Sequence, residues 1–151
     1  MSHNGLHLVR PSEVARGAAA DPPVAAPRLL LVEDDAAIRE SLAEALEQEE
    51  FEVLTAANGR EALTLLREGP RPSAILLDLM MPVMDGWDFR HEQLQDPALR
   101  NIPVLVISAA GFSRDTVRMQ FGDVELIPKP VPYVELLEAL GRACGATASA
   151  A

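Results

Sequence analysis

The stretch AILLDLMMPVMDG, residues 74–86, decides the fold of this chain. It begins as a short apolar run, reaches a carboxylate at Asp78 and ends in a turn at Gly86. Three other short apolar runs also lead into polar side chains, and these are Glu33-Asp34-Asp35, Ser108 and Lys129. If the runs are neighbouring parallel strands, their carboxyl ends share one edge of a sheet. That edge would carry the carboxylates, the hydroxyl and the ammonium that metal-assisted phosphoryl transfer to a carboxylate requires.

Strand-like and helix-like patterns alternate on both sides of this stretch. Apolar residues recur at helical spacing between the strands, as in Ile38, Leu42 and Leu46. The predicted strands are residues 29–32, 51–55, 73–78, 102–107 and 124–127, and the predicted helices are residues 36–48, 58–69, 85–95, 113–120 and 132–140. Several strands are almost entirely apolar, which indicates helices on both faces of the sheet. The pattern predicts an α/β domain with a doubly wound sheet of five parallel strands.

The composition of the chain limits its possible binding partners and its cellular compartment. The 151 residues carry a formal net charge of −10, so we expect neither nucleic acid nor an anionic membrane as a partner. No run approaches the roughly 18 apolar residues of a membrane span, and the first ten residues do not form a secretory signal. The single cysteine, Cys144, excludes an internal disulfide and suits a reducing compartment. We therefore expect a cytoplasmic protein.

Three segments of the chain differ in composition. Residues 1–27 are rich in proline and alanine and hold few large apolar side chains, which predicts a flexible tail because little burial offsets its ordering entropy. Residues 28–143 hold the alternating pattern and form one predicted domain. Residues 144–151 contain mostly small side chains and are expected to fray. Neither a second domain nor an internal repeat is visible.

The first acidic cluster has two interpretations. Glu33, Asp34 and Asp35 are adjacent at a strand end, and their carboxylates repel one another unless a cation compensates. Hard oxygen ligands suit Mg²⁺, which keeps several waters and bridges to phosphate. Aspartates at such a position also cap the first turn of a following helix. Both interpretations stay open for the cluster, and Asp35 is the predicted N-cap even if Asp34 is a metal ligand.

Asp78, Ser108 and Lys129 end the other runs. A carboxylate at Asp78 could accept a phosphoryl group and form an acyl phosphate that water later hydrolyses, although a strand-end aspartate alone is more often a loop or cap residue. Ser108 could donate a hydrogen bond to a phosphoryl oxygen, and Lys129, the only lysine, could neutralise another. The combination is more specific than any member, because strand ends often finish in serine or lysine.

Over about residues 28–143 the chain resembles the receiver domains of two-component response regulators. The resemblance is carried by LLVEDD at residues 30–35, DLMMPVMDG at residues 78–86, Ser108-Ala109 and Lys129-Pro130. Residues 78–86 are the most specific of these motifs. The resemblance implies a flavodoxin-like fold with strand order 2-1-3-4-5. It also implies a cis peptide bond between Lys129 and Pro130.

The resemblance implies a role for each site residue. Asp78 would be the phosphoacceptor, and Ser108 and Lys129 would contact its phosphoryl group. Mg²⁺ would be the cofactor, and its ligands would be Asp34, Asp78, the backbone carbonyl of Met80 and, through water, Glu33. The donor would be a sensor histidine kinase or a histidine phosphotransfer protein. Phosphorylation would then change the binding of a downstream protein target.

Further expectations concern signalling. Receivers often have an aromatic residue three positions before the lysine, where this chain has Leu126, so signalling on that face would run through Ser108 and the backbone or be weak. Phosphoryl lifetime in the family depends partly on the positions of Met80 and Ala110, and neither side chain can position an attacking water. This predicts a long-lived phospho-form. No output domain follows Leu140, so we expect a stand-alone receiver that assists its own phosphorylation and dephosphorylation but is not a turnover enzyme.

Two other function classes fit these residues less well. An interaction module with the same fold but no phosphorylation would leave the competent site residues unexplained. A phosphatase of the haloacid dehalogenase type also uses a strand-end aspartate, but it typically needs a second aspartate two residues later, where this chain has Met80. His3, His7 and His91 lack the spacing of metal ligands, so no metal is assigned to them.

Overall fold

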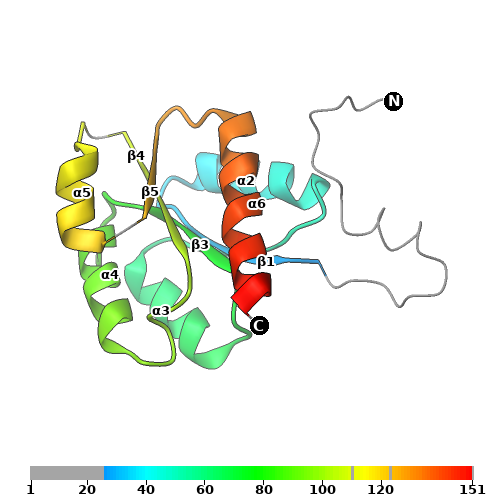
Figure 1. The fold of residues 1–151 in the computed structure, drawn as a ribbon. Coiled ribbons are helices and arrows are strands. Elements are labelled where there is room, and N and C mark those ends of the chain that lie inside the picture. Colours follow the sequence, from blue (N-terminus) through cyan, green and yellow to red (C-terminus); the bar gives the residue numbers. More distant parts are fainter. Residues whose placement is uncertain (1–25, 110, 123, 151) are drawn as a thin grey trace.

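The computed structural model describes residues 26–109, 111–122 and 124–150, and its strands and helices alternate along the chain (Figure 1). The strands are β1 (Arg28–Val32), β2 (Glu52–Ala56), β3 (Ala74–Asp78), β4 (Val104–Ser108) and β5 (Glu125–Pro128). The helices are α2 (Ala36–Gln48), α3 (Gly59–Glu68), α4 (Gly86–Gln95), α5 (Arg114–Phe121) and α6 (Tyr133–Ala150). Each strand and helix expected from the sequence is present. The predicted N-terminal tail lies outside the described residues except for its last two positions.

All five strands are parallel and lie in the order β2-β1-β3-β4-β5, which confirms the predicted doubly wound α/β fold. The chain leaves β1 toward β2 on one side and then crosses back to β3 on the other. Val32 of β1 pairs with Leu77 of β3, so the two strands end almost level. This change of direction opens a crevice at the carboxyl ends of β1 and β3, where ligands bind in sheets of this kind.

Helices cover both faces of the sheet (Figure 1). α2 and α6 pack on one face, the latter through Leu136 and Leu140, and α3, α4 and α5 pack on the other. Successive β3 side chains alternate between the two cores, with Leu76 beneath α2 and α6 and with Ile75 and Leu77 on the opposite side. Because both faces are covered, every residue of β3 and β4 is buried.

Aromatic side chains gather between α4 and α5. The ring of Trp87 meets the rings of Phe112 and Phe121 edge-on, each at a centroid distance of 5.1 Å. Leu126 of β5, where receivers often have an aromatic residue, is half-buried and packs against the same core. Trp87 therefore fixes the start of α4 against α5.

The helix α6 is longer than its sequence pattern predicts. It continues to Ala150, so the predicted frayed tail over residues 144–151 is helical as far as that residue. The core contacts of Leu136 and Leu140 anchor the helix, and alanine, which is frequent beyond them, has the highest helix propensity. Even at this length, neither α6 nor any other helix among the described residues is long and apolar enough to cross a membrane.

Candidate functional site

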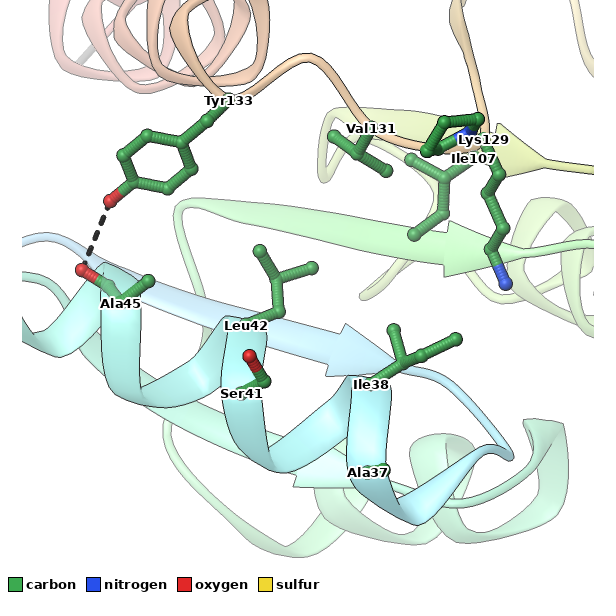
Figure 2. A pocket seen from close by; sticks show the side chains of 10 residues that line it. Ala37, Ile38, Ser41, Leu42, Ala45, Ile107, Lys129, Val131 and Tyr133 are labelled. Atoms are coloured by element: carbon green, nitrogen blue, oxygen red, sulfur yellow. Dashed lines mark hydrogen bonds between the residues drawn. The ribbon is translucent and has the colours of Figure 1, made fainter.

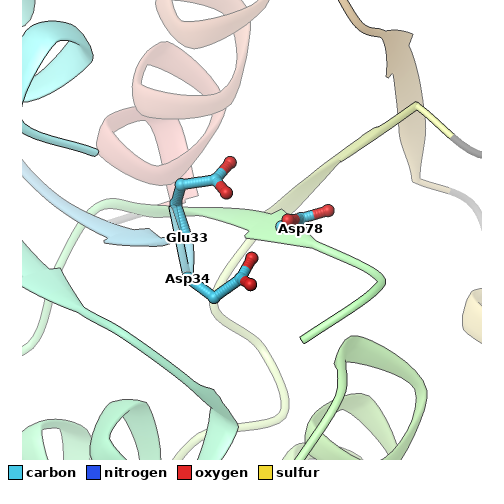
Figure 3. Close-up of side chains that lie close together, drawn as sticks. All are labelled: Glu33, Asp34 and Asp78. Atoms are coloured by element: carbon cyan, nitrogen blue, oxygen red, sulfur yellow. The ribbon is translucent and has the colours of Figure 1, made fainter. Parts of the chain in front are cut away.

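Three carboxylates meet at the crevice between β1 and β3. Glu33 and Asp34 directly follow β1, and Asp78 is the last residue of β3 (Figure 3). Their carboxylate oxygens lie within 4.8 Å of one another. The sheet topology thus brings together residues that are more than forty positions apart in the sequence.

Lys129 bridges two of these carboxylates. Its Nζ donates a hydrogen bond to Oε1 of Glu33 at 2.8 Å and to Oδ2 of Asp78 at 3.2 Å. The backbone N–H of Lys129 donates to the carbonyl of Ser108 at 3.0 Å, which holds the lysine at the end of β4. Burial alone would lower the pKa of Lys129, but Glu33 and Asp78 raise it above its ordinary value. The ammonium is therefore charged at neutral pH, and the Lys129–Pro130 bond is cis, as the resemblance implies.

Asp78 is buried, with 4% of its surface exposed. Burial, followed by repulsion from Glu33, raises the pKa of Asp78 from its ordinary value of 3.8 to about 6, although Lys129 partly offsets both effects. The single ammonium of Lys129 thus compensates the carboxylates at this edge only in part. A further cation at this site would stabilise their charged forms.

The three consecutive acidic residues after β1 have different partners. Glu33 is fully buried, and its second oxygen, Oε2, accepts the N–H of Asp35 at 3.1 Å. The side chain of Asp35 accepts the N–H of Ile38 at 3.0 Å, which confirms Asp35 as the N-cap of α2. The carboxylate of Asp34 is exposed and accepts no hydrogen bond from the described part of the chain.

This distribution of partners fits a hard divalent cation. From the described residues, the carboxylate of Asp34 accepts no hydrogen bond, and Oδ1 of Asp78 accepts a 3.4 Å contact from the N–H of Met80. Both oxygens of Glu33 already accept hydrogen bonds, so Glu33 suits a ligand that acts through water. A few carboxylates together with several waters are the ligands that Mg²⁺ prefers.

The two remaining predicted residues lie at the same edge. Ser108 is the last residue of β4, the strand next to β3, and it is buried with 7% of its surface exposed. Met80 lies two residues beyond Asp78 and has 56% of its surface exposed. Ala110, which the resemblance connects with phosphoryl lifetime, lies outside the described residues.

The loop after Asp78 folds back onto the end of β3 at Gly86. The N–H of Gly86 donates to the carbonyl of Leu79 at 2.8 Å. A Cβ atom at position 86 would lie 2.6 Å from the backbone oxygen of Asp78 and 2.8 Å from Cα of Leu79. Only glycine fits this close approach of two backbone segments.

Gly86→Ala is therefore expected to destabilise the fold by about 2 kcal/mol, because the backbone at Asp78 must shift to admit the methyl group. Urea denaturation of the variant and the parent protein measures this difference. Gly111→Ala is the matched control, since a Cβ at position 111 meets nothing within 4 Å. Equal losses in both variants would contradict the proposed backbone clash.

One polar residue at the site was not singled out from the sequence. Nη1 of Arg39, in the first turn of α2, donates to the carbonyl of Glu33 at 2.9 Å and reaches the carbonyl of Asp34 at 3.4 Å. The contact depends on the shape of the turn between β1 and α2, which sequence periodicity does not define. The available signal was a cation at the start of a helix, where the helix dipole disfavours positive charge.

The chain is similar to known proteins over most of its length. Residues 29–141 match the family of response regulator receiver domains. Response regulator MprA of Mycolicibacterium vanbaalenii is 39% identical over 111 residues, which cover 73% of this chain and 47% of that protein. Transcriptional regulatory protein PrrA of Mycobacterium tuberculosis is 39% identical over 137 residues, which cover 85% of this chain and 56% of that protein. The chain thus spans about half the length of the curated relatives it matches.

Similar solved structures are receiver domains as well. A response regulator receiver protein from Pseudomonas putida is 27% identical with a TM-score of 0.72, over 79% of this chain and 98% of that chain. The receiver domain of the Francisella response regulator 1452 is 25% identical with a TM-score of 0.71, over 80% of this chain and 98% of that chain. Sequence and fold together therefore place this chain in the response regulator receiver domain family, whose members are phosphoacceptors in two-component signalling.

Proposed function

We propose that Asp78 accepts a phosphoryl group from a phosphohistidine of a partner protein. The observation that carries this proposal is the position of Asp78, which lies at the switch point between Lys129 on one side and the open carboxylate of Asp34 on the other. Response regulators receive their phosphoryl groups from sensor kinases, so the donor is a sensor histidine kinase or a histidine phosphotransfer protein.

The transfer is a displacement at phosphorus. A carboxylate oxygen of Asp78 forms the new P–O bond while the P–N bond to the donor imidazole breaks. The imidazole, protonated on its other ring nitrogen, leaves with the bonding electron pair as a neutral ring. The product on Asp78 is an acyl phosphate. Hydrolysis later returns the carboxylate and inorganic phosphate. The raised pKa of Asp78 means that pH values above about 6 favour the carboxylate form, which is the nucleophile.

The residues around Asp78 stabilise the negative charge on the phosphoryl group during the reaction. Asp34 and Asp78 would hold Mg²⁺ directly, Glu33 would hold it through water and the carbonyl of Met80 would complete the protein ligands. When bound, this ion neutralises charge on the phosphoryl oxygens. Lys129 already lies 3.2 Å from Asp78 and exchanges its carboxylate contact for a phosphoryl oxygen. Ser108, at the end of the next strand, donates its hydroxyl to another phosphoryl oxygen.

The signal leaves the domain as a change in protein binding. Phosphorylation adds negative charge beside Lys129 and Ser108, which moves the loops that follow β4 and β5. A downstream protein target then binds the changed surface with a different affinity. The relatives are about twice as long as the region they share with this chain. Their similarity to this chain therefore does not identify the target.

Phosphoramidate tests the proposal, because it carries the P–N bond of a phosphohistidine without a protein partner. We expect the purified protein to gain one phosphoryl group in the presence of MgCl₂ and none in the presence of a chelator. Intact-mass spectrometry measures the addition. No addition with Mg²⁺, while circular dichroism shows a folded protein, would contradict the proposal and favour a binding module that does not use phosphorylation.

The acyl phosphate is expected to be long-lived, because the thioether of Met80 cannot orient an attacking water. Met80→Asn places an amide that can hold such a water at the same exposed position, so its phosphate half-life is expected to fall about tenfold. Release of inorganic phosphate after removal of the donor measures the half-life. Met80→Leu is the matched apolar control and keeps the long half-life. Rapid loss from the parent protein would count against the proposed role of this position.

A further inference from the structure

We propose that Arg39 is a positioning residue that aims the carboxylate of Asp34 at the metal site. This inference rests on the proposed function, because it assumes that Asp34 holds Mg²⁺. Arg39 belongs to the first turn of α2, four residues after the N-cap Asp35. Its guanidinium contacts the backbone beside Asp34 and makes no ion pair with any carboxylate of the described residues.

The contacts of Arg39 lie on both sides of Asp34. The carbonyl of Glu33, 2.9 Å from Nη1, belongs to the peptide group before Asp34. The carbonyl of Asp34, 3.4 Å from the same nitrogen, belongs to the peptide group after it. Two peptide planes that flank a Cα atom determine the direction of its Cα–Cβ bond. Arg39 therefore restrains the direction in which the side chain of Asp34 leaves the backbone.

Asp34 is the carboxylate that needs this restraint. Glu33 is fixed by Lys129 and by the N–H of Asp35, and Asp78 is fixed by Lys129. The side chain of Asp34 accepts no hydrogen bond from the described residues and is exposed. Before an ion arrives, the place of this carboxylate therefore depends on the backbone that carries it and on its own rotamer.

The position of Arg39 is not explained by helix stability. Positive charge in the first turn of a helix opposes the helix dipole, so an arginine there weakens the helix end. Nη1 of the half-buried side chain instead donates to the turn that carries the acidic cluster. This arrangement resembles the partners around metal ligands in other proteins, which orient a ligand without touching the ion.

Charge and positioning predict opposite effects of removing Arg39. The guanidinium repels any cation at the site, so its loss acting through charge alone would tighten the binding of every divalent ion equally. Loss of positioning instead weakens binding, and it weakens Mg²⁺ more than Ca²⁺. The reason is that Mg²⁺ demands near-octahedral geometry, whereas Ca²⁺ accepts irregular and more numerous oxygen ligands.

Isothermal titration calorimetry with MgCl₂ or CaCl₂ alone, on the full chain, separates these effects. We expect Arg39→Ala to weaken Mg²⁺ binding about tenfold and Ca²⁺ binding clearly less. Arg39→Lys keeps the charge and a single donor nitrogen, and it is expected to recover part of the Mg²⁺ affinity. Arg39→Met keeps the apolar stem and supplies the same comparison as alanine if Arg39→Ala does not fold.

Arg100→Ala is the matched control, because Arg100 is exposed and precedes β4 at the opposite edge of the sheet. It removes one positive charge without touching the site and is expected to leave both affinities unchanged. Unchanged or tighter Mg²⁺ binding in Arg39→Ala, or equal losses for Mg²⁺ and Ca²⁺, would overturn the positioning role while leaving the proposed function intact. A parent protein that binds no Mg²⁺ would overturn both.

Discussion

An Asp78→Ala variant treated with acetyl phosphate and MgCl₂ is expected to gain no phosphoryl group, whereas the parent protein gains one. The reaction needs an oxygen nucleophile at the end of β3, and alanine supplies none. Neighbouring carboxylates cannot substitute. Both oxygens of Glu33 accept hydrogen bonds, and Asp34 lies away from Ser108 on the far side of β3, at the end of β1.

Intact-mass spectrometry before and after incubation measures the addition, and the expected difference is complete rather than partial. Asp88→Ala is the matched control, because Asp88 is an exposed carboxylate in the first turn of α4, ten residues after Asp78. It is expected to be phosphorylated like the parent protein. Addition to Asp78→Ala at the parent rate would place the phosphoryl group on another residue and would contradict the assignment of Asp78.

An Asp78→Asn variant is expected to be more stable than the parent protein by about 2–3 kcal/mol at pH 8 without divalent ions. The buried carboxylate of Asp78 is charged at this pH, although burial and Glu33 both favour its neutral form. The amide keeps the shape and an acceptor oxygen for Lys129 but carries no charge. The functional carboxylate thus lowers the stability of the fold that holds it.

The pH dependence of this difference has a definite sign. The pKa of Asp78 is about 6 in the folded protein, above the ordinary value of 3.8 that applies to the unfolded chain. Between these pH values Asp78 is ionised in the unfolded chain but still largely protonated in the folded protein. The parent protein therefore loses stability as the pH rises from about 4 to about 6. The advantage of Asp78→Asn is therefore fully present above pH 6 and vanishes below about pH 4.

Urea denaturation at several pH values, with a chelator present, measures this difference. Adding MgCl₂ is expected to raise the stability of the parent protein and to narrow the gap, because a bound cation compensates Asp78. Asp88→Asn, which removes an exposed charge from α4, is expected to change stability by less than about 1 kcal/mol. A less stable Asp78→Asn at pH 8 would show that the ion pair with Lys129 outweighs the burial of Asp78.

The sequence was sufficient for the fold because each signal was local. The apolar runs at β1, β3 and β4 and the helical spacing of Ile38, Leu42 and Leu46 depend only on which side chains a sheet or helix must bury. The end of α6 was less predictable. The small residues beyond Cys144 indicate neither core packing nor the end of a helix. Their helical state follows from the preceding turns of α6, which pack on the core.

The sequence by itself also determined which chemical groups reach the acidic edge. Glu33, Asp78, Ser108 and Lys129 stand at the ends of strands or directly after them, and such ends share one edge once the strands are parallel neighbours. Only the tertiary structure decided which hydrogen-bond or ion-pair partner each of these groups has. Lys129 bridges Glu33 and Asp78, Asp35 caps α2, and Asp34 stays open beside the backbone contacts of Arg39. Periodicity defines which face a residue occupies, whereas hydrogen-bond partners and pKa values depend on distances of a few ångströms between segments far apart in the chain.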